Sequence, residues 1–230
     1  LRRAAAVADR AFQKALESLR EGVRESDFCA ELEYLMQKEG ARKPSFDTIV
    51  ASGPNGAFPH AGVTDRVIRA GELITLDFGV VLDGYNSDIT RTVWLGELPP
   101  DQEKIYRVVR QAHRAALEVL RAGKKAGEVD AAARQVIADA GWAEAFSHGL
   151  GHGLGLAVHE MPRLRPNTET VLEAGMVVTV EPGVYLPGVG GSRVEDSVIV
   201  TETGFEYLTR SPYQERGPHP LQGSAPGLIA

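Results

Sequence analysis

Two aspartates on a predicted β-hairpin are the first side chains in this sequence that could hold a metal ion. Apolar and polar residues roughly alternate on both sides of Asp83-Gly84, a dipeptide that suits a two-residue type I′ turn. That turn fixes a register in which Asp88 faces Gly79 and Asp77 is its diagonal neighbour on the same face. Because Gly79 leaves the space opposite Asp88 empty, the two carboxylates would converge, and a divalent cation would offset their repulsion. The alternative is a pair of solvated strand aspartates.

Three histidines lie in or beside a glycine-rich stretch further along the chain. His148 and His152 are four residues apart, which is the spacing of a zinc-binding helix. The alternating glycines argue against a helix, because each costs about 1 kcal/mol relative to alanine. We expect an extended or looped segment whose backbone makes a close approach. Nucleotide-binding glycine patterns are absent, and Arg163 follows His159-Glu160 where a zincin helix would have its second histidine.

Two glutamates stand within apolar strand-like sequence near the C-terminal end. Glu181 follows Val177–Val180, and Glu195 follows Arg193-Val194. A buried glutamate without a partner costs several kcal/mol, so such positions call for a nearby cation. For either residue alone, the exposed face of an edge strand is the alternative.

Taken together, five of these positions and their motifs resemble the ligand motifs of the pita-bread metallopeptidases. That family includes methionine aminopeptidase, prolidase and Xaa-Pro aminopeptidase, and the resemblance covers roughly residues 1–210. It implies that Asp77 binds one metal ion and that Asp88 and Glu195 bridge two. It also implies that His152 and Glu181 complete the site of the second ion.

The same resemblance implies roles for residues around the metal site. His60, His148 and His159 would line the substrate cleft. Glu181 would accept a proton from the attacking water, while His159 and His60 would hydrogen-bond the developing oxygens or the leaving nitrogen. Arg193 could support a metal-ligating aspartate or reach the substrate, and a surface salt bridge is the alternative.

The ligand set also indicates the metal and the chemistry. Four carboxylates balance two divalent cations, and this oxygen-rich set with one imidazole suits Mn²⁺, with Co²⁺ or Zn²⁺ as alternatives. Two cations about 3.5–4 Å apart can lower the pKa of a bound water from about 16 towards 7. The resemblance further implies a homodimer for the full-length enzyme.

Three stretches favour the proline-specific branch over the methionine aminopeptidases: 85–92, 153–160 and 190–196. We therefore expect an Xaa-Pro aminopeptidase of the aminopeptidase P type, acting on Xaa-Pro-Xaa peptides. Prolidase, the Xaa-Pro dipeptidase, is the alternative.

A strict dipeptidase needs a fixed positive group near the metals to hold the terminal carboxylate of the dipeptide. Arg163 and Arg165 could serve, but Pro162 and Pro166 suggest a loop that turns outward. This observation favours the aminopeptidase.

A different class of function is a metal-free relative of the same fold, either a creatine hydrolase or a peptide- or histone-binding module. Such relatives have lost metal ligands, whereas this chain keeps all five. Stoichiometric metal in the purified protein would therefore distinguish an enzyme from a binding module.

The amino-acid composition limits which binding partners and which cellular compartment we expect for this protein. The chain has 230 residues, 43% of them hydrophobic, and a net charge of −6, which argues against nucleic acid as a partner. It contains no apolar run of membrane-spanning length and no secretory signal. Cys29 is the only cysteine, which is consistent with a reducing cytoplasm, and we expect it to be an inert, buried thiol.

Hydrophobic periodicity gives the order helix, helix, strands, and then the same order again. This duplication predicts an α+β fold, and the resemblance implies two pseudo-symmetric halves around a curved antiparallel sheet.

Residues 211–230 are rich in proline and glycine and are expected to form a disordered tail. By the same resemblance, we expect this chain to lack the separate N-terminal domain that the proline-specific branch normally carries. Helices are expected at 1–24, 27–38 (capped by Ser26), 101–123 and 129–140, with strands at 46–51, 75–94, 176–185, 192–201 and 205–208.

Overall fold

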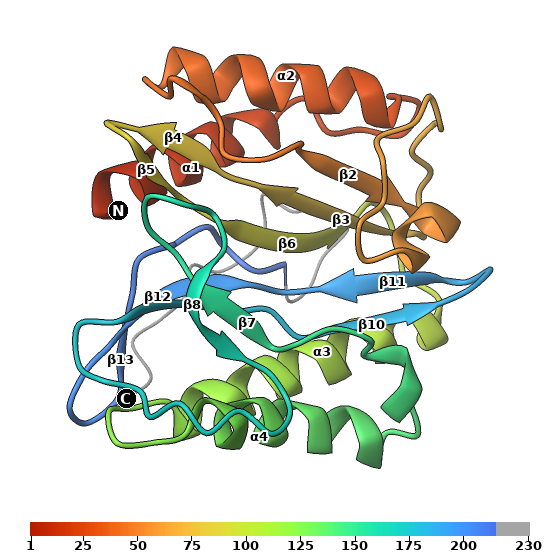
Figure 1. The fold of residues 1–230 in the computed structure, drawn as a ribbon. Coiled ribbons are helices and arrows are strands. Elements are labelled where there is room, and N and C mark those ends of the chain that lie inside the picture. Colours follow the sequence, from red (N-terminus) through yellow and green to blue (C-terminus); the bar gives the residue numbers. More distant parts are fainter. Residues whose placement is uncertain (215–230) are drawn as a thin grey trace.

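Two pairs of helices enclose the strands from opposite sides in the computed structural model, which describes residues 1–214 (Figure 1). One pair precedes the first set of strands, and the other precedes the second set, so the chain order repeats as expected. The predicted α+β pita-bread architecture is confirmed. The helices are α1 (Arg2–Ala15), α2 (Glu25–Lys38), α3 (Pro100–Val119) and α4 (Ala126–Asp139).

Each helix pair covers its own hydrophobic core. Phe12, Leu32 and Phe78 belong to the cluster beneath α1 and α2, while Val109, Ile137 and Val198 belong to the cluster beneath α3 and α4. Both cores are closed by apolar faces of strands, which is how an amphipathic helix and a half-buried sheet stabilise each other. Within residues 1–214, no helix combines the length and apolar character that a membrane span requires.

The N-terminal half contains the predicted hairpin in the predicted register. Asp77 pairs with Thr90, and Leu82 pairs with Tyr85 across the turn. Asp83 and Gly84 both have positive φ, 51° and 86°, as a type I′ turn requires. The strands of this half are β1 (Lys43–Pro44), β2 (Ile49–Ser52), β3 (Leu73–Phe78), β4 (Val80–Leu82), β5 (Tyr85–Asn86) and β6 (Ile89–Trp94).

The reason for the glycine opposite Asp88 differs from the expectation. Gly79 does not leave an empty space: a Cβ atom there would collide with the carbonyl oxygen of Ser87 and the hydroxyl of Ser45. Glycine is therefore needed because neighbouring chain segments approach closely where β3 gives way to β4.

Several helix boundaries differ from the predicted ones: α3 ends at Val119 and not at residue 123, α4 begins at Ala126 and not at residue 129, and the first two helices differ as follows. The first helix ends at Ala15, well before residue 24, and the second begins at Glu25. Ser26 is not the N-cap, because its hydroxyl donates to Asp65 at 3.0 Å. A local capping pattern was outweighed here by a contact with a distant loop.

In the C-terminal half, the two long predicted strands are each interrupted. Residues 176–185 form β9 and β10, separated at Glu181-Pro182, and residues 192–201 form β11 and β12, separated at Val194-Glu195. The pairs Gly183–Arg193 and Val180–Asp196 keep one common register across the break. That register places Glu181 opposite Glu195. The strands are β7 (Gly151–Gly153), β8 (Glu160–Leu164), β9 (Val177–Val180), β10 (Gly183–Leu186), β11 (Gly190–Arg193), β12 (Asp196–Val200) and β13 (Phe205–Tyr207).

The segment after β13 is packed where a tail was expected. Ser211, Tyr213 and Gln214 are buried, and Gln214 forms two hydrogen bonds with the backbone of Trp94. The expectation of disorder from Ser211 onward is wrong at these positions, because polar contacts with β6 replace the missing apolar pattern. The rest of the expected tail, 215–230, lies outside the described residues.

Candidate metal centre

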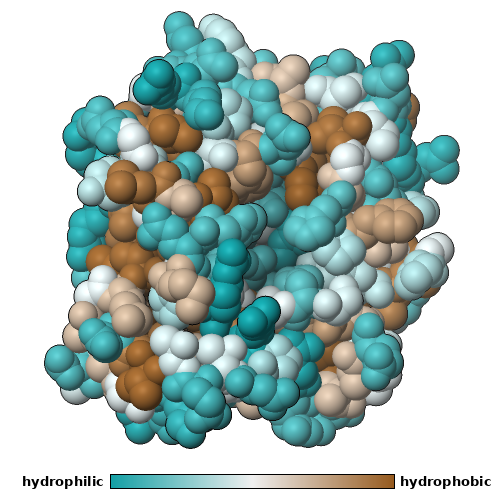
Figure 2. Space-filling view, viewed as in Figure 1, coloured by the Kyte–Doolittle hydropathy of each residue, from teal (hydrophilic) through white to brown (hydrophobic). Residues whose placement is uncertain are grey.

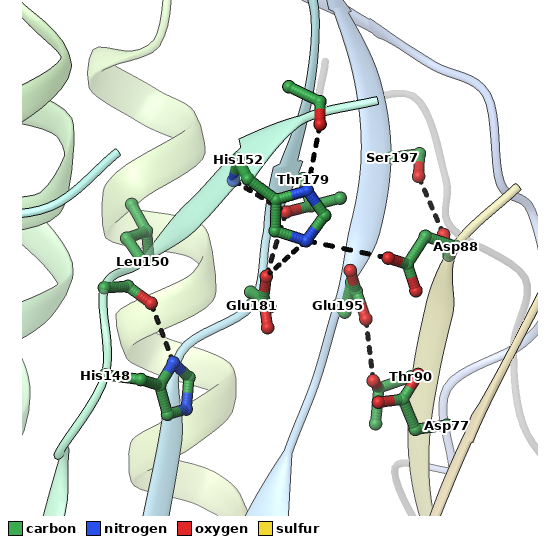
Figure 3. Close-up of polar contacts among 12 residues, drawn as sticks. Asp77, Asp88, Thr90, His148, Leu150, His152, Thr179, Glu181, Glu195 and Ser197 are labelled. Atoms are coloured by element: carbon green, nitrogen blue, oxygen red, sulfur yellow. Dashed lines mark hydrogen bonds and ion pairs between the residues drawn. The ribbon is translucent and has the colours of Figure 1, made fainter. Parts of the chain in front are cut away.

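All five predicted ligands gather at one cleft of about 670 Å³ between the two halves. Asp77 lies on β3, and Asp88 directly precedes β6, both from the N-terminal half. His152 lies on β7, while Glu181 and Glu195 occupy the two strand interruptions (Figure 3). Figure 2 shows a recess near the middle of the molecule, bordered mainly by hydrophilic residues. Each half thus contributes carboxylates to a shared polar site.

Three of the five side chains are close enough to share one metal ion. Ligand atoms of Asp88, His152 and Glu195 all lie within 4.8 Å of one another, and all three residues are buried. His152 Nε2 also lies 3.6 Å from Asp88 Oδ2 and 3.2 Å from Glu181 Oε1 (Figure 3). The imidazole therefore stands between two carboxylates, one from each half.

The contacts of the His152 ring indicate its tautomer when it acts as a ligand. Its Nδ1 lies 3.0 Å from the carbonyl oxygen of Gly153, a contact that requires a proton on Nδ1. In the neutral ring, Nε2 then presents a lone pair towards the carboxylates. The backbone is fixed as well, because the amide of His152 donates to Thr179 Oγ1 at 3.0 Å. Lone pairs that face one another in this way are arranged to share a cation.

The carboxylates repel one another strongly in the absence of a cation. Burial raises the pKa of Asp88 well above its ordinary value, and the charges of Asp77 and Glu181 raise it further. Burial and the charges of Asp88 and Glu181 do the same to the pKa of Glu195. Burial also raises the pKa of Glu181, but a protonated His152, together with the charges of His148 and Arg193, outweighs burial, so that pKa is lowered. One imidazole cannot neutralise four carboxylates.

Two carboxylate oxygens at the site have no hydrogen-bond partner although they are buried. They are Asp77 Oδ1 and Glu195 Oε1. The other oxygen of each residue is bonded, Asp77 Oδ2 by Arg193 at 2.6 Å and Glu195 Oε2 by Thr90 Oγ1 at 2.7 Å. Buried acceptors are rarely left unpaired, so these oxygens mark where cations would bind. The donor set fits two divalent cations, whose charge would balance the four carboxylates.

Arg193 supports the centre and is not part of a surface salt bridge. Its side chain is buried, and all three guanidinium nitrogens contact protein acceptors. It bonds Asp77, the hydroxyl of Tyr185 at 2.8 Å and the carbonyl oxygen of Pro59 at 3.0 Å. Of the two predicted roles, the structure favours support of Asp77 over contact with a substrate.

The three cleft histidines all line the same cavity as the predicted ligands. His148 has both ring nitrogens engaged, Nδ1 with the carbonyl oxygen of Gly149 at 2.7 Å and Nε2 with the hydroxyl of Tyr185 at 2.9 Å. The His159 ring packs edge-on against the His152 ring, with centroids 4.3 Å apart. Burial and the charge of His152 lower the pKa of His159, so its imidazole is neutral at pH 7. His60 is exposed at the end of its loop.

Several residues that hold the site residues in place were not predicted from the sequence. Thr90 shares the cleft-facing side of its strand with Asp88, a relation that a period of two could have revealed. Tyr185 joins His148 to Arg193 through its hydroxyl. Asn86 donates to the carbonyl oxygens of Gly155 and Leu156, at 3.1 and 2.9 Å, and holds the loop before His159.

The expectation of an outward loop around Arg163 is wrong. Arg163 lies on β8, pairs with His152 and lines the cleft, and Arg165 lines it too. Pro162 is accommodated because β8 is the edge strand of its sheet, where a missing N–H costs no ladder hydrogen bond. The cleft therefore has a cationic side next to the carboxylate cluster.

Comparison with known proteins places the chain in a family. The family model described as metallopeptidase family M24 matches residues 1–202. A curated Xaa-Pro dipeptidase from Pyrococcus furiosus is 45% identical over 211 residues, covering 92% of this chain and 61% of that protein. A solved Xaa-Pro dipeptidase from Bacillus anthracis matches with a TM-score of 0.91 and 47% identity, covering 93% of this chain and 60% of that one. The X-Pro aminopeptidase from Thermotoga maritima MSB8 matches with a TM-score of 0.88 and 41% identity, covering 90% and 59%.

The chain belongs to metallopeptidase family M24, and the resemblance seen in its motifs is thereby confirmed. It spans about three fifths of the length of the relatives named above. Those relatives carry both dipeptidase and aminopeptidase names, with the dipeptidases at the higher identities.

Proposed function

We propose that this protein is a metal-dependent Xaa-Pro dipeptidase, which reverses the order of the two activities expected from the sequence. The observation that carries the proposal is the cationic side of the cleft: Arg163 and Arg165 line the same cavity as the five predicted ligands. A dipeptide presents its terminal carboxylate one residue beyond the scissile bond, within reach of such groups. The names of the more similar relatives support the same reading.

The two-metal assignment is part of this proposal. Asp77, Asp88, His152, Glu181 and Glu195 would hold two divalent cations, with Mn²⁺ favoured by the oxygen-rich set and Co²⁺ or Zn²⁺ as alternatives. When bound, such a pair supplies a water of lowered pKa and polarises the peptide carbonyl. Elemental analysis after reconstitution with each metal tests it, and a maximum of one ion per chain would contradict it.

The protein side chains would divide the remaining work among them. Glu181 reaches the cleft with an oxygen 3.2 Å from His152 and would accept the proton lost by the attacking water. His159, neutral at pH 7, would donate a hydrogen bond to the developing oxygen or the leaving nitrogen. Arg193 would hold Asp77 in place while Arg163 and Arg165 bind the substrate carboxylate.

The decisive experiment compares kcat/KM for an Xaa-Pro dipeptide, an Xaa-Pro-Xaa tripeptide and a Met-Ala-Xaa tripeptide on the metal-loaded protein. We expect a preference for the dipeptide. A preference for Xaa-Pro-Xaa would restore the aminopeptidase P assignment, and cleavage of Met-Ala-Xaa alone would indicate a methionine aminopeptidase. Arg163→Met and Arg165→Met should raise KM for the dipeptide more than for the tripeptide.

A second experiment tests the proposed role of His159. His159→Ala should lower turnover by about 10²–10⁴-fold, the usual contribution of a general acid or base. Bound metal should be unchanged, because His159 is placed beside His152 and not among the ligands. Loss of metal from this variant would show that the roles of His152 and His159 are reversed.

The family resemblance also supports a homodimer. This assembly is proposed for the full-length enzyme, where light scattering tests it, and a single-chain mass for the full-length enzyme would contradict it.

A further inference from the structure

The loop that carries His60 is fastened to α2 by one buried carboxylate. Glu25, in the first turn of α2, is fully buried and accepts five hydrogen bonds, all from residues 52–64. Oε1 accepts the amide and hydroxyl of Ser52, at 2.7 and 2.8 Å. Oε2 accepts Asn55 Nδ2 at 2.9 Å and, from Thr64, the amide at 3.2 Å and the hydroxyl at 2.5 Å.

These bonds close the loop at its base. Ser52 ends β2 and Thr64 follows the loop, so a single carboxylate joins the two points where the chain leaves and re-enters the fold. The backbone adds to this closure, because the amide of Ser26 donates to the carbonyl oxygen of Thr64 at 3.0 Å. Loop ends held together in this way restrict every residue between them.

The loop is only partly packed, because Ala57 and Ala61 are buried while the residues between them are more exposed. Pro54, Phe58 and His60 are exposed, and Phe58 retains 62% of its accessible surface. The second attachment is polar as well, because the carbonyl oxygen of Pro59, next to His60, accepts a hydrogen bond from Arg193 at 3.0 Å. Arg193 in turn bonds Asp77. His60 is thus positioned between an anchor at the loop base and the support of the metal site.

We propose that Glu25 is a positioning residue for catalysis: it fixes the 52–64 loop so that His60 is held at the cleft. This inference rests on the proposed function and on the role that the family resemblance implies for His60, a hydrogen bond to the reacting peptide. A carboxylate is required because all five partners are donors, and glutamine would turn a donor towards at least one of them. The buried charge is retained at a cost in desolvation that its hydrogen bonds offset.

The first test is Glu25→Gln, compared with Asp27→Asn as the matched control. Asp27 is an exposed acid in the same helical turn, so its variant makes the same chemical change away from the loop. We expect Glu25→Gln to lower kcat/KM for an Xaa-Pro dipeptide by about 10- to 100-fold, the effect of small displacements of a catalytic group. Metal content should match the parent, and Asp27→Asn should retain parental activity. Unchanged activity in Glu25→Gln would overturn the proposal.

A double-mutant cycle with His60→Ala separates positioning from general stability. If Glu25 acts through His60, adding Glu25→Gln to His60→Ala should cause no further loss of kcat/KM. Equal losses in the presence and absence of His60 would show that Glu25 only maintains the fold, and would overturn the proposal.

Thr64 offers a milder version of the same test should Glu25→Gln fold poorly. Thr64→Val removes the hydroxyl that bonds Glu25, whereas Thr64→Ser keeps it. We expect Thr64→Val to lose activity several-fold and Thr64→Ser to restore it to near the parental level. Equal activity of the two variants would contradict the anchoring role.

Hydrogen–deuterium exchange distinguishes failure of this inference from failure of the proposed function. Exchange of the 52–64 amides should be faster in Glu25→Gln and Thr64→Val than in the parent, Asp27→Asn or Thr64→Ser, whatever peptide the enzyme cleaves. If no Xaa-Pro peptide is cleaved but exchange changes as expected, the substrate assignment fails while the anchor stands. Unchanged exchange would overturn the anchor itself.

Discussion

Glu195 and Asp196 are adjacent in sequence and equally buried, yet their surroundings are opposite in character. Glu195 lines the cleft among other carboxylates, and burial together with the charges of Asp88 and Glu181 raises its pKa well above the ordinary value. Burial would raise the pKa of Asp196 too, but the charge of Arg91 and the contacts with His113, whose Nε2 lies 3.2 Å from Oδ2, and with Tyr213 outweigh it, and that pKa is lowered. Burial alone therefore does not identify a metal ligand; the partners of the carboxylate do.

The region around Asp196 is a closed polar network behind the metal centre. Arg91 bonds Asp196 at 2.8 Å, Thr209 donates to it at 2.7 Å, and the hydroxyl of Tyr213 donates to its other oxygen. Arg91 also donates to the backbone carbonyl oxygen of Glu195 at 2.5 Å. A hydrogen-bonded network thus fixes the backbone of Glu195, whose own carboxylate has an unpaired oxygen, so that scaffold and proposed ligand are neighbours in the chain.

The largest effect is expected for Glu195→Gln, which keeps the shape and removes the charge. Activity should fall by at least about 10³-fold, since metal ions contribute several kcal/mol to catalysis. The free energy of unfolding of the metal-free variant should equal or exceed that of the parent, because one of several repelling carboxylates is gone. Peptide hydrolysis measures the loss of activity, and denaturant unfolding of the chelator-treated protein measures the free energy of unfolding. Activity within tenfold of the parent would remove Glu195 from the centre.

Asp196→Asn should have the opposite effect on stability and lower the free energy of unfolding. Removing the carboxylate leaves Arg91 buried without its counter-ion, which costs about 3–5 kcal/mol in the free energy of unfolding. Urea denaturation of the metal-free protein measures this loss directly, with metal-free Glu195→Gln as the matched comparison. If the two variants were equally stable, the contrast between the adjacent carboxylates would be broken.

Tyr213→Phe should weaken the same network by a smaller amount. The variant keeps the ring beside Arg91 and removes only the donor to Asp196. A lost hydrogen bond in a buried site costs about 1–3 kcal/mol. Tyr34→Phe, at an exposed position, serves as the control and should leave the urea midpoint unchanged. A similar midpoint for both variants would show that the segment after β13 contributes little.

The pH dependence of stability should differ in sign between the two carboxylates in chelator-treated protein. The folded-state pKa of Glu195 is raised, so stability falls as pH rises above its unfolded value of about 4, by up to about 1.4 kcal/mol per pH unit. The folded-state pKa of Asp196 is lowered, so its contribution is lost as pH falls below about 4. Glu195→Gln should flatten the decline above pH 4, and saturating Mn²⁺ should abolish it. A metal-free parent with constant stability from pH 4 to 7 would contradict the raised pKa.

Sequence motifs were sufficient to predict the five residues that the structure brings to one cleft, and local sequence was sufficient for the hairpin that carries two of them. The period of two and the Asp83-Gly84 turn predict the pairing of Asp77 with Thr90 that the structure shows. Helix positions followed from the apolar stripes, whereas their ends did not, as Ser26 illustrates. The predicted low reactivity of Cys29 also agrees with the structure, because burial raises the pKa of its thiol to about 12.

Local sequence patterns could not predict the interactions between segments that are distant in the chain. The sequence shows Glu195 and Asp196 as two similar acids, and nothing near them reveals that Tyr213 and Arg91 will neutralise one and not the other. The anchoring of residues 52–64 by Glu25 and the cleft-facing position of Arg163 are of the same kind.

The sequence by itself determined how the β3–β6 hairpin pairs, because periodicity and turn chemistry act over a few residues, and its motifs indicated which residues to propose as metal ligands. Only the tertiary structure decided which buried charges are paired, because a carboxylate's pKa depends on the groups that folding brings within a few ångströms of it. Glu195 and Asp196 differ in pKa for that reason. Although they are adjacent in the chain, Glu195 is surrounded by hydrogen-bond acceptors and Asp196 by hydrogen-bond donors.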